Sequence, residues 1–396
     1  MLKESAPRVR RDRIAISLVF AVHGTVEGTY ASRLPWIADH VHATPGLLGA
    51  AMIAPTAGAL LSMPFASRIV HRLGSARTAL RLMLMLWTAC LVIPGVMPNI
   101  GLLAAGLFVY GATSGVADVM MNAEAVRIER RVGRSIMSGL HGLWSVGGIA
   151  GALMGALCAG AGISAMPEFL ITALILTAAA AFAASLLPAD AELGGGAQEA
   201  IRPPRFALPT KALLGIGVVG FCAIFGEGAG TNWSAVYLTT VAHASPAIGA
   251  YCVTGFATTM AVGRLTGDAI VRRLGPVYVV RVGGVLAVIG AVAVVMARTP
   301  WLGIVGFAAM GLGIATGVPL AIAAAGRIGR DADSAVAGIT TVTYSAGLLA
   351  GPSVGALGSA VSLPFAFGVV ALLALGLVFS AYTLRVGLVE SPVMTK

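Results

Sequence analysis

Charged residues are scarce in this chain. Only 11% of its 396 residues are Asp, Glu, Lys or Arg, whereas a soluble domain has about 25%. Hydrophobic residues make up 58% of the sequence, and the mean hydropathy is +0.91. This composition excludes an ordinary soluble protein and indicates a protein that crosses a membrane several times. The hydrophobic stretches are long and do not alternate with a period of two residues, so we expect membrane helices and not barrel strands.

Cysteine is rare as well. The four cysteines all lie in hydrophobic stretches, and no pair has the CxxC spacing. This pattern favours small packing residues over a disulfide framework or a zinc site. The sequence also lacks the phosphate-binding loop GxxxxGK[ST] and the zinc-binding motif HExxH. We therefore expect no cofactor, no bound metal and no enzymatic activity.

Acidic residues are fewer than basic ones. The chain has 16 Asp and Glu and 26 Lys and Arg, which gives a formal net charge of +10. The basic residues do not form one patch for nucleic acid. All except Arg33 and Arg298 fall in the N-terminal tail, around alternate short loops, in a central linker or at the C-terminal end. Basic loops of membrane proteins face the cytoplasm, so we expect both termini there and no nucleic-acid partner.

Twelve hydrophobic stretches are long enough to cross a bilayer, which takes about 20 residues. The expected spans are residues 14–37, 46–66, 78–97, 100–124, 136–162, 167–187, 211–237, 246–266, 277–297, 301–325, 335–360 and 363–385. Between the sixth and seventh spans, the chain is rich in Gly, Pro and charge, as a linker is. The expected domains are thus residues 1–187, a cytoplasmic linker at 188–210, and residues 211–396.

The two halves of the chain repeat each other at an offset of about 200 residues. The matching positions are Glu27 and Glu227, Arg72 and Arg273, Gly74 and Gly275, and the glycine rows 147/151/155 and 347/351/355. Parallel repeats of six helices are a known transporter architecture. We therefore expect an all-α membrane protein with two six-helix bundles related by a pseudo-two-fold repeat.

One short loop carries a recognisable motif. The stretch from Gly263 to Gly275 reads GRLTGDAIVRRLG, and it resembles the loop signature of the major facilitator superfamily. The resemblance implies twelve membrane helices around a central cavity and a gating role for Asp268, Arg272 and Arg273. The first half of the chain departs from the signature, because it has Ser67 where the signature has aspartate.

A closer resemblance covers most of the chain. The segments that carry it are GVADVMMNAEAVRIERRVGRSIMSGLHGLWSVGGIAG, EGAGTNWSAVYL, SRLPW, Tyr344 and Gly351-Pro352. Together they are similar to a bacterial group of inner-membrane facilitators typified by YbjJ and including MosC, and more distantly to fucose-permease-like sugar/proton symporters. The group often has Asp-Trp where this chain has Asn232-Trp233. The resemblance implies a bacterial inner-membrane location and a sugar, polyol or related small metabolite as the solute.

Glu27 and Glu227 are the foremost candidate functional residues. A charged group at the centre of a membrane helix costs about 2.5–3.5 kcal/mol on insertion scales, so each carboxylate needs a reason to be there. Burial favours the neutral form of a carboxyl group, which lets it bind and release a proton near neutral pH. The alternative is a structural role, in which each carboxylate forms hydrogen bonds that hold its helix in register.

Further polar candidates lie in the first half. Asp118 and Asn122 are one helical turn apart and share a face, whereas Glu124 is expected to pair with Arg127 or Arg131. His141 could relay protons, and His23 lies one turn before Glu27 and could be its partner. For both histidines, a hydrogen-bonded packing role is the alternative.

Three aromatic side chains are candidates for stacking on a flat solute. They are Trp144, Trp233 and Tyr344. Tyr344 occupies in the second repeat the place that Trp144 holds in the first. The expected function is secondary active transport of a small polar solute by alternating access, and the expected state is a monomer. The expected partners are the solute, protons bound by the buried carboxylates, and the lipid bilayer. The alternatives are an exporter of drugs or metabolites with the same fold, and a membrane receptor or scaffold that transports nothing.

Overall fold

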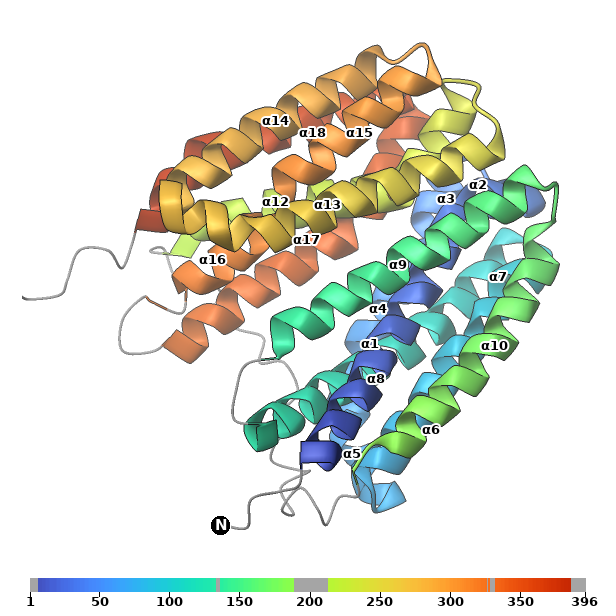
Figure 1. Ribbon diagram of the computed structural model, residues 1–396. Coiled ribbons are helices and arrows are strands. Elements are labelled where there is room, and N and C mark those ends of the chain that lie inside the picture. Colours follow the sequence, from blue (N-terminus) through green and yellow to red (C-terminus); the bar gives the residue numbers. More distant parts are fainter. Residues whose placement is uncertain (1–5, 133–135, 189–212, 326, 328–331, 386–396) are drawn as a thin grey trace, which may run out of the picture. The chain divides into compact units, whose positions relative to one another are not determined.

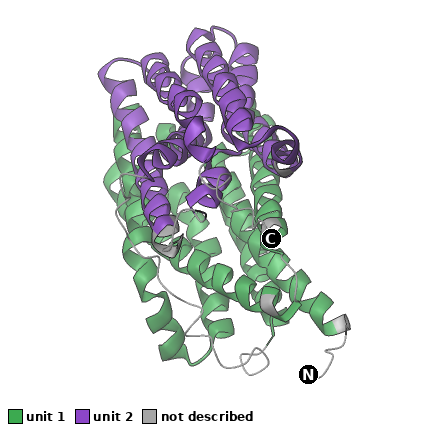
Figure 2. Cartoon of the chain, turned by 90° about the vertical axis from the view of Figure 1, so that its left-hand side faces the viewer, with its two compact units in different colours: residues 1–204, 245–254 green, residues 205–244, 255–396 purple. Residues whose placement is uncertain are grey.

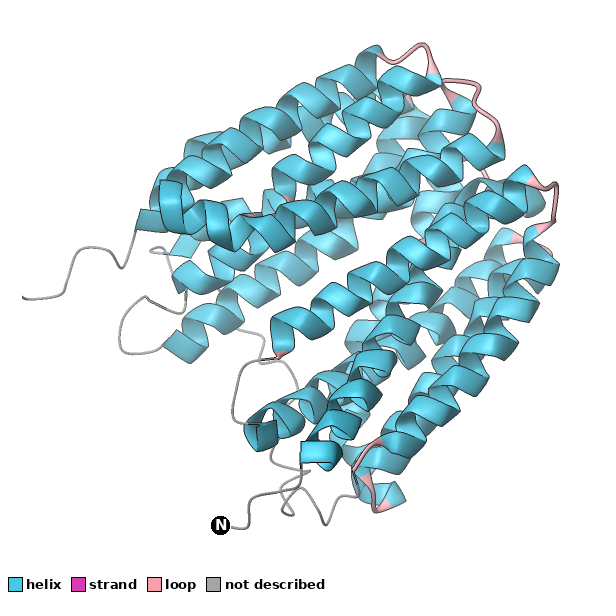
Figure 3. Ribbon diagram, in the orientation of Figure 1, coloured by secondary structure: helices cyan, strands magenta, loops and turns pink. Residues whose placement is uncertain are grey.

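The computed structural model describes residues 6–132, 136–188, 213–325, 327 and 332–385. In these residues every regular element is a helix (Figure 3). The expected linker at 188–210 lies outside the described residues except for its first position. The described chain divides into two compact units, residues 1–204 with 245–254 and residues 205–244 with 255–396 (Figure 2).

The first unit holds the first six expected spans (Figure 1). Its elements are α1 (Ala6–Ser32), α2 (Leu34–His40), α3 (Pro45–Ala51), α4 (Ile53–Ser62), η1 (Met63–Phe65), α5 (Ala66–Leu73), α6 (Ala76–Ala89), η2 (Cys90–Val92), α7 (Ile93–Val96), α8 (Ile100–Val132), α9 (Met137–Gly160) and α10 (Ala165–Leu186). Proline has no backbone N–H and interrupts helical hydrogen bonding. Accordingly, the second and third spans contain 3-10 turns beside Pro64 and Pro94.

The second unit repeats this order. Its elements are α12 (Leu214–Thr240), α13 (Pro246–Leu274), α14 (Pro276–Met296), α15 (Pro300–Ile314), α16 (Gly317–Ala325), α17 (Ala332–Ala360), α18 (Leu363–Ser380) and η5 (Ala381–Arg385). The first turns of α13, up to Thr254, are grouped with the first unit. Three of these helices begin with a proline, where the missing N–H needs no partner. The α17 helix continues through Pro352.

Ten helical segments of the described chain are long and apolar enough to cross a membrane. They correspond to ten of the twelve expected spans, and α13 and α17 occupy the places of the eighth and eleventh. The prediction of an all-α protein is confirmed for the described residues, and their ten membrane-length helices fit the expected order of twelve spans.

Helix packing repeats between the units. In the first unit α1 packs on α9, α4 on α8, and α6 on α10. In the second unit the corresponding helices pair in the same way, α12 with α17 and α14 with α18, and Gly263 of α13 lies against Ala315 at the end of α15. The repeat that is visible in the sequence is therefore also a repeat of helix contacts.

Candidate functional site

The α1 helix, which carries Glu27, packs backbone to backbone on α9. A methyl group at Gly24 or Gly28 of α1 would overlap the carbonyl oxygens of Trp144 or Gly148. From the other side, a methyl group at Gly151 would overlap the Thr25 carbonyl oxygen. Glycine rows permit such close approach, so α9 fixes the position of the helix segment around Glu27.

Glu27 is half-buried and lies within electrostatic reach of the Tyr110 hydroxyl on α8. Tyr110 belongs to a chain of ring contacts, with Trp87 of α6 at 4.2 Å and Tyr30 of α1 at 5.4 Å between ring centroids. All three rings are buried. The sequence reasoning missed this aromatic cluster, although Tyr30 follows Glu27 by three residues and therefore lies on the same face of α1.

His23 joins the same cluster one turn before Glu27. Its ring stacks on Trp87 at 5.2 Å, and its Nδ1 accepts a hydrogen bond of 3.2 Å from the indole Nε1 of Trp144. Because Nδ1 accepts, the neutral imidazole carries its proton on Nε2. The structure thus brings two predicted site residues, His23 and Trp144, into direct contact. Trp144 remains half-buried.

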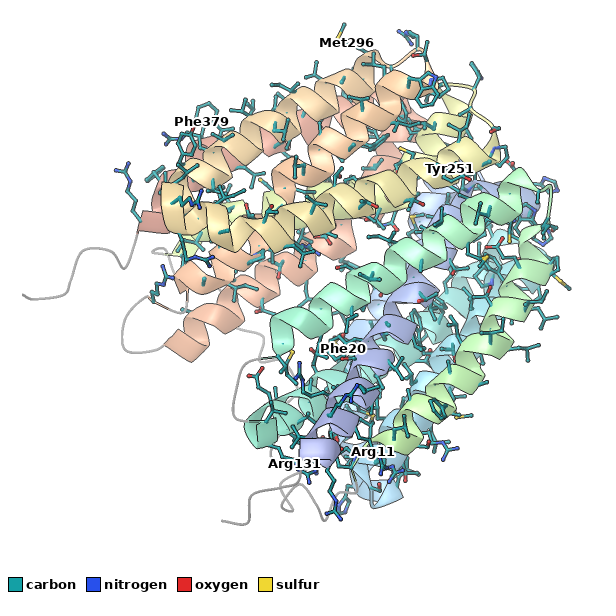
Figure 4. All side chains as sticks on the ribbon, viewed as in Figure 1. Arg11, Phe20, Arg131, Tyr251, Met296 and Phe379 are labelled. Atoms are coloured by element: carbon teal, nitrogen blue, oxygen red, sulfur yellow. The ribbon has the colours of Figure 1, made fainter. Side chains whose placement is uncertain are left out.

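Asp118 and Asn122 also lie together, as their spacing predicts. The Asn122 Nδ2 donates to the carboxylate Oδ1 of Asp118 at 3.1 Å and to its backbone oxygen at 2.9 Å. Both side chains are half-buried on α8. His141 is exposed at the start of α9, where its ring meets Phe20 of α1 edge-on at 5.3 Å (Phe20 is labelled in Figure 4).

In the second unit Glu227 has a cationic partner. It lies at the middle of α12, and its Oε2 accepts a hydrogen bond of 2.7 Å from Arg264 of α13. The sequence reasoning grouped Arg264 with the basic loop residues. The structure instead places it inside α13, ten residues before the helix ends at Leu274, and so about 15 Å from that end.

The other second-unit candidates differ in accessibility. Trp233 is completely buried, and its Nε1 donates to the carbonyl oxygen of Gly351 at 3.1 Å. No surface of Trp233 is left for a solute to stack on in this structure. Asn232 on α12 and Tyr344 on α17 are half-buried.

A buried ion pair in the first unit escaped the sequence reasoning. The sequence predicts that Arg33, unlike the basic loop residues, lies on the non-cytoplasmic side. Its Nε donates to Glu168 of α10 at 2.7 Å, and another guanidinium nitrogen donates to the carbonyl oxygen of Ile163. The side chains of Arg33 and Glu168 are 4% and 1% exposed. This pair joins the ends of α1 and α10.

Charged residues also gather where α8 ends. The expected pairing of Glu124 with Arg127 is confirmed at 2.8 Å. Arg131, labelled in Figure 4, binds Asp12 of α1 at 2.9 Å. The Glu129 carboxylate accepts hydrogen bonds from the backbone N–H groups of Ile136 and Met137. An anionic group at a helix N-terminus is stabilising, so Glu129 caps α9.

The signature loop of the second half is the end of α13. Arg272 and Arg273 lie exposed in its last turn, and the side chain of Asp268 lies outside the described residues. The glycine that closes each copy of the motif, Gly74 or Gly275, has a positive φ of 67° or 80°. Glycine adopts that conformation without strain, which explains why both repeats have it there.

Among the described residues, no three His, Cys, Asp or Glu side chains come together as metal ligands. Each unit thus offers at least one half-buried carboxylate: Glu27 and Asp118 in the first unit, and Glu227 in the second.

The comparisons with known proteins agree with this arrangement. Residues 16–276 match the family model of the Major Facilitator Superfamily. An uncharacterised MFS-type transporter of Yersinia pestis is 34% identical over 93% of this chain and 94% of its own length. The uncharacterised transporter y4wD of Sinorhizobium fredii is 32% identical over 90% of this chain and 93% of its own length. The membrane protein MosC of Rhizobium meliloti is 28% identical over 88% of this chain and 84% of its own length.

Two solved structures share the fold. A bacterial homologue of the human lysosomal transporter Spinster, in an inward-facing and unoccupied conformation, aligns with a TM-score of 0.75 over 98% of this chain and 100% of its own. The nucleoside transporter NupG aligns with a TM-score of 0.71 over 95% of this chain and 98% of its own. Both are 12% identical to this chain.

Proposed function

The chain belongs to the major facilitator superfamily and is a membrane transporter rather than an enzyme, and from that premise we propose that it moves a small polar solute by proton-coupled alternating access. The solute class is a sugar, a polyol or a related metabolite. The location is a bacterial inner membrane with both termini in the cytoplasm, and the working unit is a monomer. The distribution of basic residues supports this orientation.

The observation that carries the proposal is the placement of the two matched carboxylates. Glu27 and Glu227 lie on the spans with the largest buried share of the ten, 56% in each case. Both side chains are nevertheless half-buried and not sealed in their bundles. Carboxylates at such depth are expensive and are typical of ion and proton pathways.

The two carboxylates have different tasks in the proposal. Glu227 holds an ion pair with Arg264, and a nearby cation favours the charged form of a carboxylate. Glu27 is half-buried and lies within electrostatic reach of the Tyr110 hydroxyl, and we place the transported proton on this carboxylate. Asp118 and Asn122 of the first unit supply hydrogen bonds to solute hydroxyl groups, and Trp144 of the same unit supplies apolar ring surface.

Uptake by the purified protein in proteoliposomes tests this function. We expect a pH gradient to drive the accumulation of at least one labelled sugar or polyol. Glu27→Gln should abolish accumulation driven by the pH gradient. The variant should still allow the solute to move down its own concentration gradient. Asp39→Asn removes an exposed carboxylate of α2 and is the matched control.

Gradient-driven flux that is undiminished in Glu27→Gln would remove this residue from proton coupling. Two other results would replace the proposal. Resistance to lipophilic cations without sugar flux would identify an exporter, and capture of a soluble partner with no flux of any solute would identify a receptor or scaffold. Reporter fusions at each terminus test the cytoplasmic orientation.

A further inference from the structure

A groove of about 360 Å³ runs along the first half of α1. It is lined by Arg10 and Arg13 at one end, by Ser17 and Ala21 further along, and by apolar side chains that include Leu143 of α9. Residues 10, 13, 14, 17, 18 and 21 recur every three or four positions, so they form one face of the helix. The groove therefore has a basic end and an apolar body.

The two arginines of the groove have no partner among the described residues. Neighbouring arginines do have partners: Arg11 donates to the carbonyl oxygen of Leu186 at 3.2 Å, and Arg77 donates to that of Ala184 at 3.2 Å. Those two side chains cap the C-terminal end of α10. Arg10 and Arg13 instead take no part in any hydrogen bond or ion pair with the described chain. Two guanidinium groups one turn apart, unpaired within the described chain, suit an anionic group with several acceptor oxygens.

The wall of the groove is apolar and exposed. Ile14, Leu18 and Leu143 are 46%, 38% and 37% exposed, whereas Ile16 and Val19 on the opposite face of α1 are fully buried. From Arg10 to Ala21 the groove extends over eleven residues, or about 16 Å of helix. Half the hydrocarbon thickness of a bilayer is about 15 Å. The groove thus matches the depth of one leaflet, with its arginines where the lipid headgroups begin.

From this geometry we propose that the groove binds one anionic phospholipid. Its phosphate accepts hydrogen bonds from Arg10 and Arg13, and one acyl chain lies along Ile14, Leu18 and Leu143. A soluble anion would use the basic end and leave the apolar wall uncovered. Because α1 also carries Glu27, the lipid contacts the helix that holds the proposed proton site, but the lipid site does not depend on that function.

Native mass spectrometry of the full-length protein with added phosphatidylglycerol tests the proposal. We expect one tightly bound lipid on the wild type. Basic residues near a membrane contribute about 1 kcal/mol each to lipid attraction, so Arg10→Gln/Arg13→Gln should weaken binding about thirtyfold. The matched control is Arg8→Gln/Arg72→Gln, which removes the same charge from exposed positions outside the groove and should leave the affinity within a factor of about two.

Three results would overturn the proposal. They are equal binding of phosphatidylcholine with the same acyl chains, competition by glycerol 3-phosphate as effective as that by the lipid, and an equal loss of affinity in the control variant. A second measurement needs no variant: photoactivatable phosphatidylglycerol should crosslink wild-type protein at residues 10–21 or at Leu143. Crosslinking only at other peptides would also contradict the site.

Discussion

The two repeats have glycines at the same spacing but pack differently. In the first repeat, a methyl group at Gly147 of α9 would overlap the carbonyl oxygen of Ala21 in α1. In the second repeat, a methyl group at Gly347 of α17 would meet only the Ile224 side chain, at an ordinary 3.6 Å. At this pair of positions, the same glycine pattern brings helix backbones together in one unit and leaves room for a side chain in the other.

Matching positions also have different partners. Position 33 holds an arginine in a buried ion pair with Glu168, whereas position 233 holds a tryptophan that donates to a backbone carbonyl. Position 27 holds a glutamate near aromatic rings, whereas position 227 holds one that is bound to Arg264. The repeat preserves the helix pairs, and the chemistry at equivalent places has diverged.

The largest expected effect is at the buried ion pair. Arg33→Met leaves Glu168 buried without its cation, and breaking a buried pair costs about 3–5 kcal/mol. The free energy of unfolding, measured in mixed micelles, should fall by that amount. The double variant Arg33→Met/Glu168→Met should recover most of the loss. If it is no more stable than the single variant, the uncompensated charge is not the cause.

The next effect contrasts the two glycine rows. Gly147→Ala forces the α9 backbone away from α1, and overpacking of this kind costs about 1–3 kcal/mol. The matched substitution Gly347→Ala has room for its methyl group and should change the free energy of unfolding by less than about 0.5 kcal/mol. Equal losses in thermal unfolding would show that the two interfaces are equally tight.

A smaller effect is expected at the position that matches Arg33. Trp233→Phe keeps a large buried ring but removes the hydrogen bond from the indole N–H to the carbonyl oxygen of Gly351. A hydrogen bond of this kind contributes about 1 kcal/mol to the free energy of unfolding. The melting temperature should fall slightly, and less than in Arg33→Met. A fall as large as that of Arg33→Met would contradict the distinction between the two positions.

The smallest effect on stability is expected at the second ion pair. The side chains of Arg264 and Glu227 are 29% and 21% exposed, and exposed pairs contribute about 0–1 kcal/mol. Arg264→Gln should therefore unfold almost like the wild type, with Arg272→Gln at an exposed position as control. A loss comparable to that of Arg33→Met would mean that the pair is shielded from water.

Some site residues were predictable and others were not. The spacing of Asp118 and Asn122 places them on one face of a helix wherever that helix packs, so their contact follows from local geometry. The partners Arg33 and Glu168 are 135 residues apart, and no periodicity links them. Arg264 resembled a loop charge because it lies close to Arg272 and Arg273 in sequence, and only the length of α13 shows that it reaches Glu227. The sequence suggested that the Trp233 ring could stack on a solute, but packing buries that ring completely.

The sequence by itself determined the membrane class, the number and order of the spans and their repetition in two halves. These features follow from apolar length and from backbone hydrogen bonding, which leave a chain in lipid few alternatives. Only the tertiary structure decided which polar groups meet: Glu227 with Arg264, His23 with Trp144, and Arg33 with Glu168. Those contacts depend on the rotation and separation of packed helices, which are set by side chains far apart along the chain.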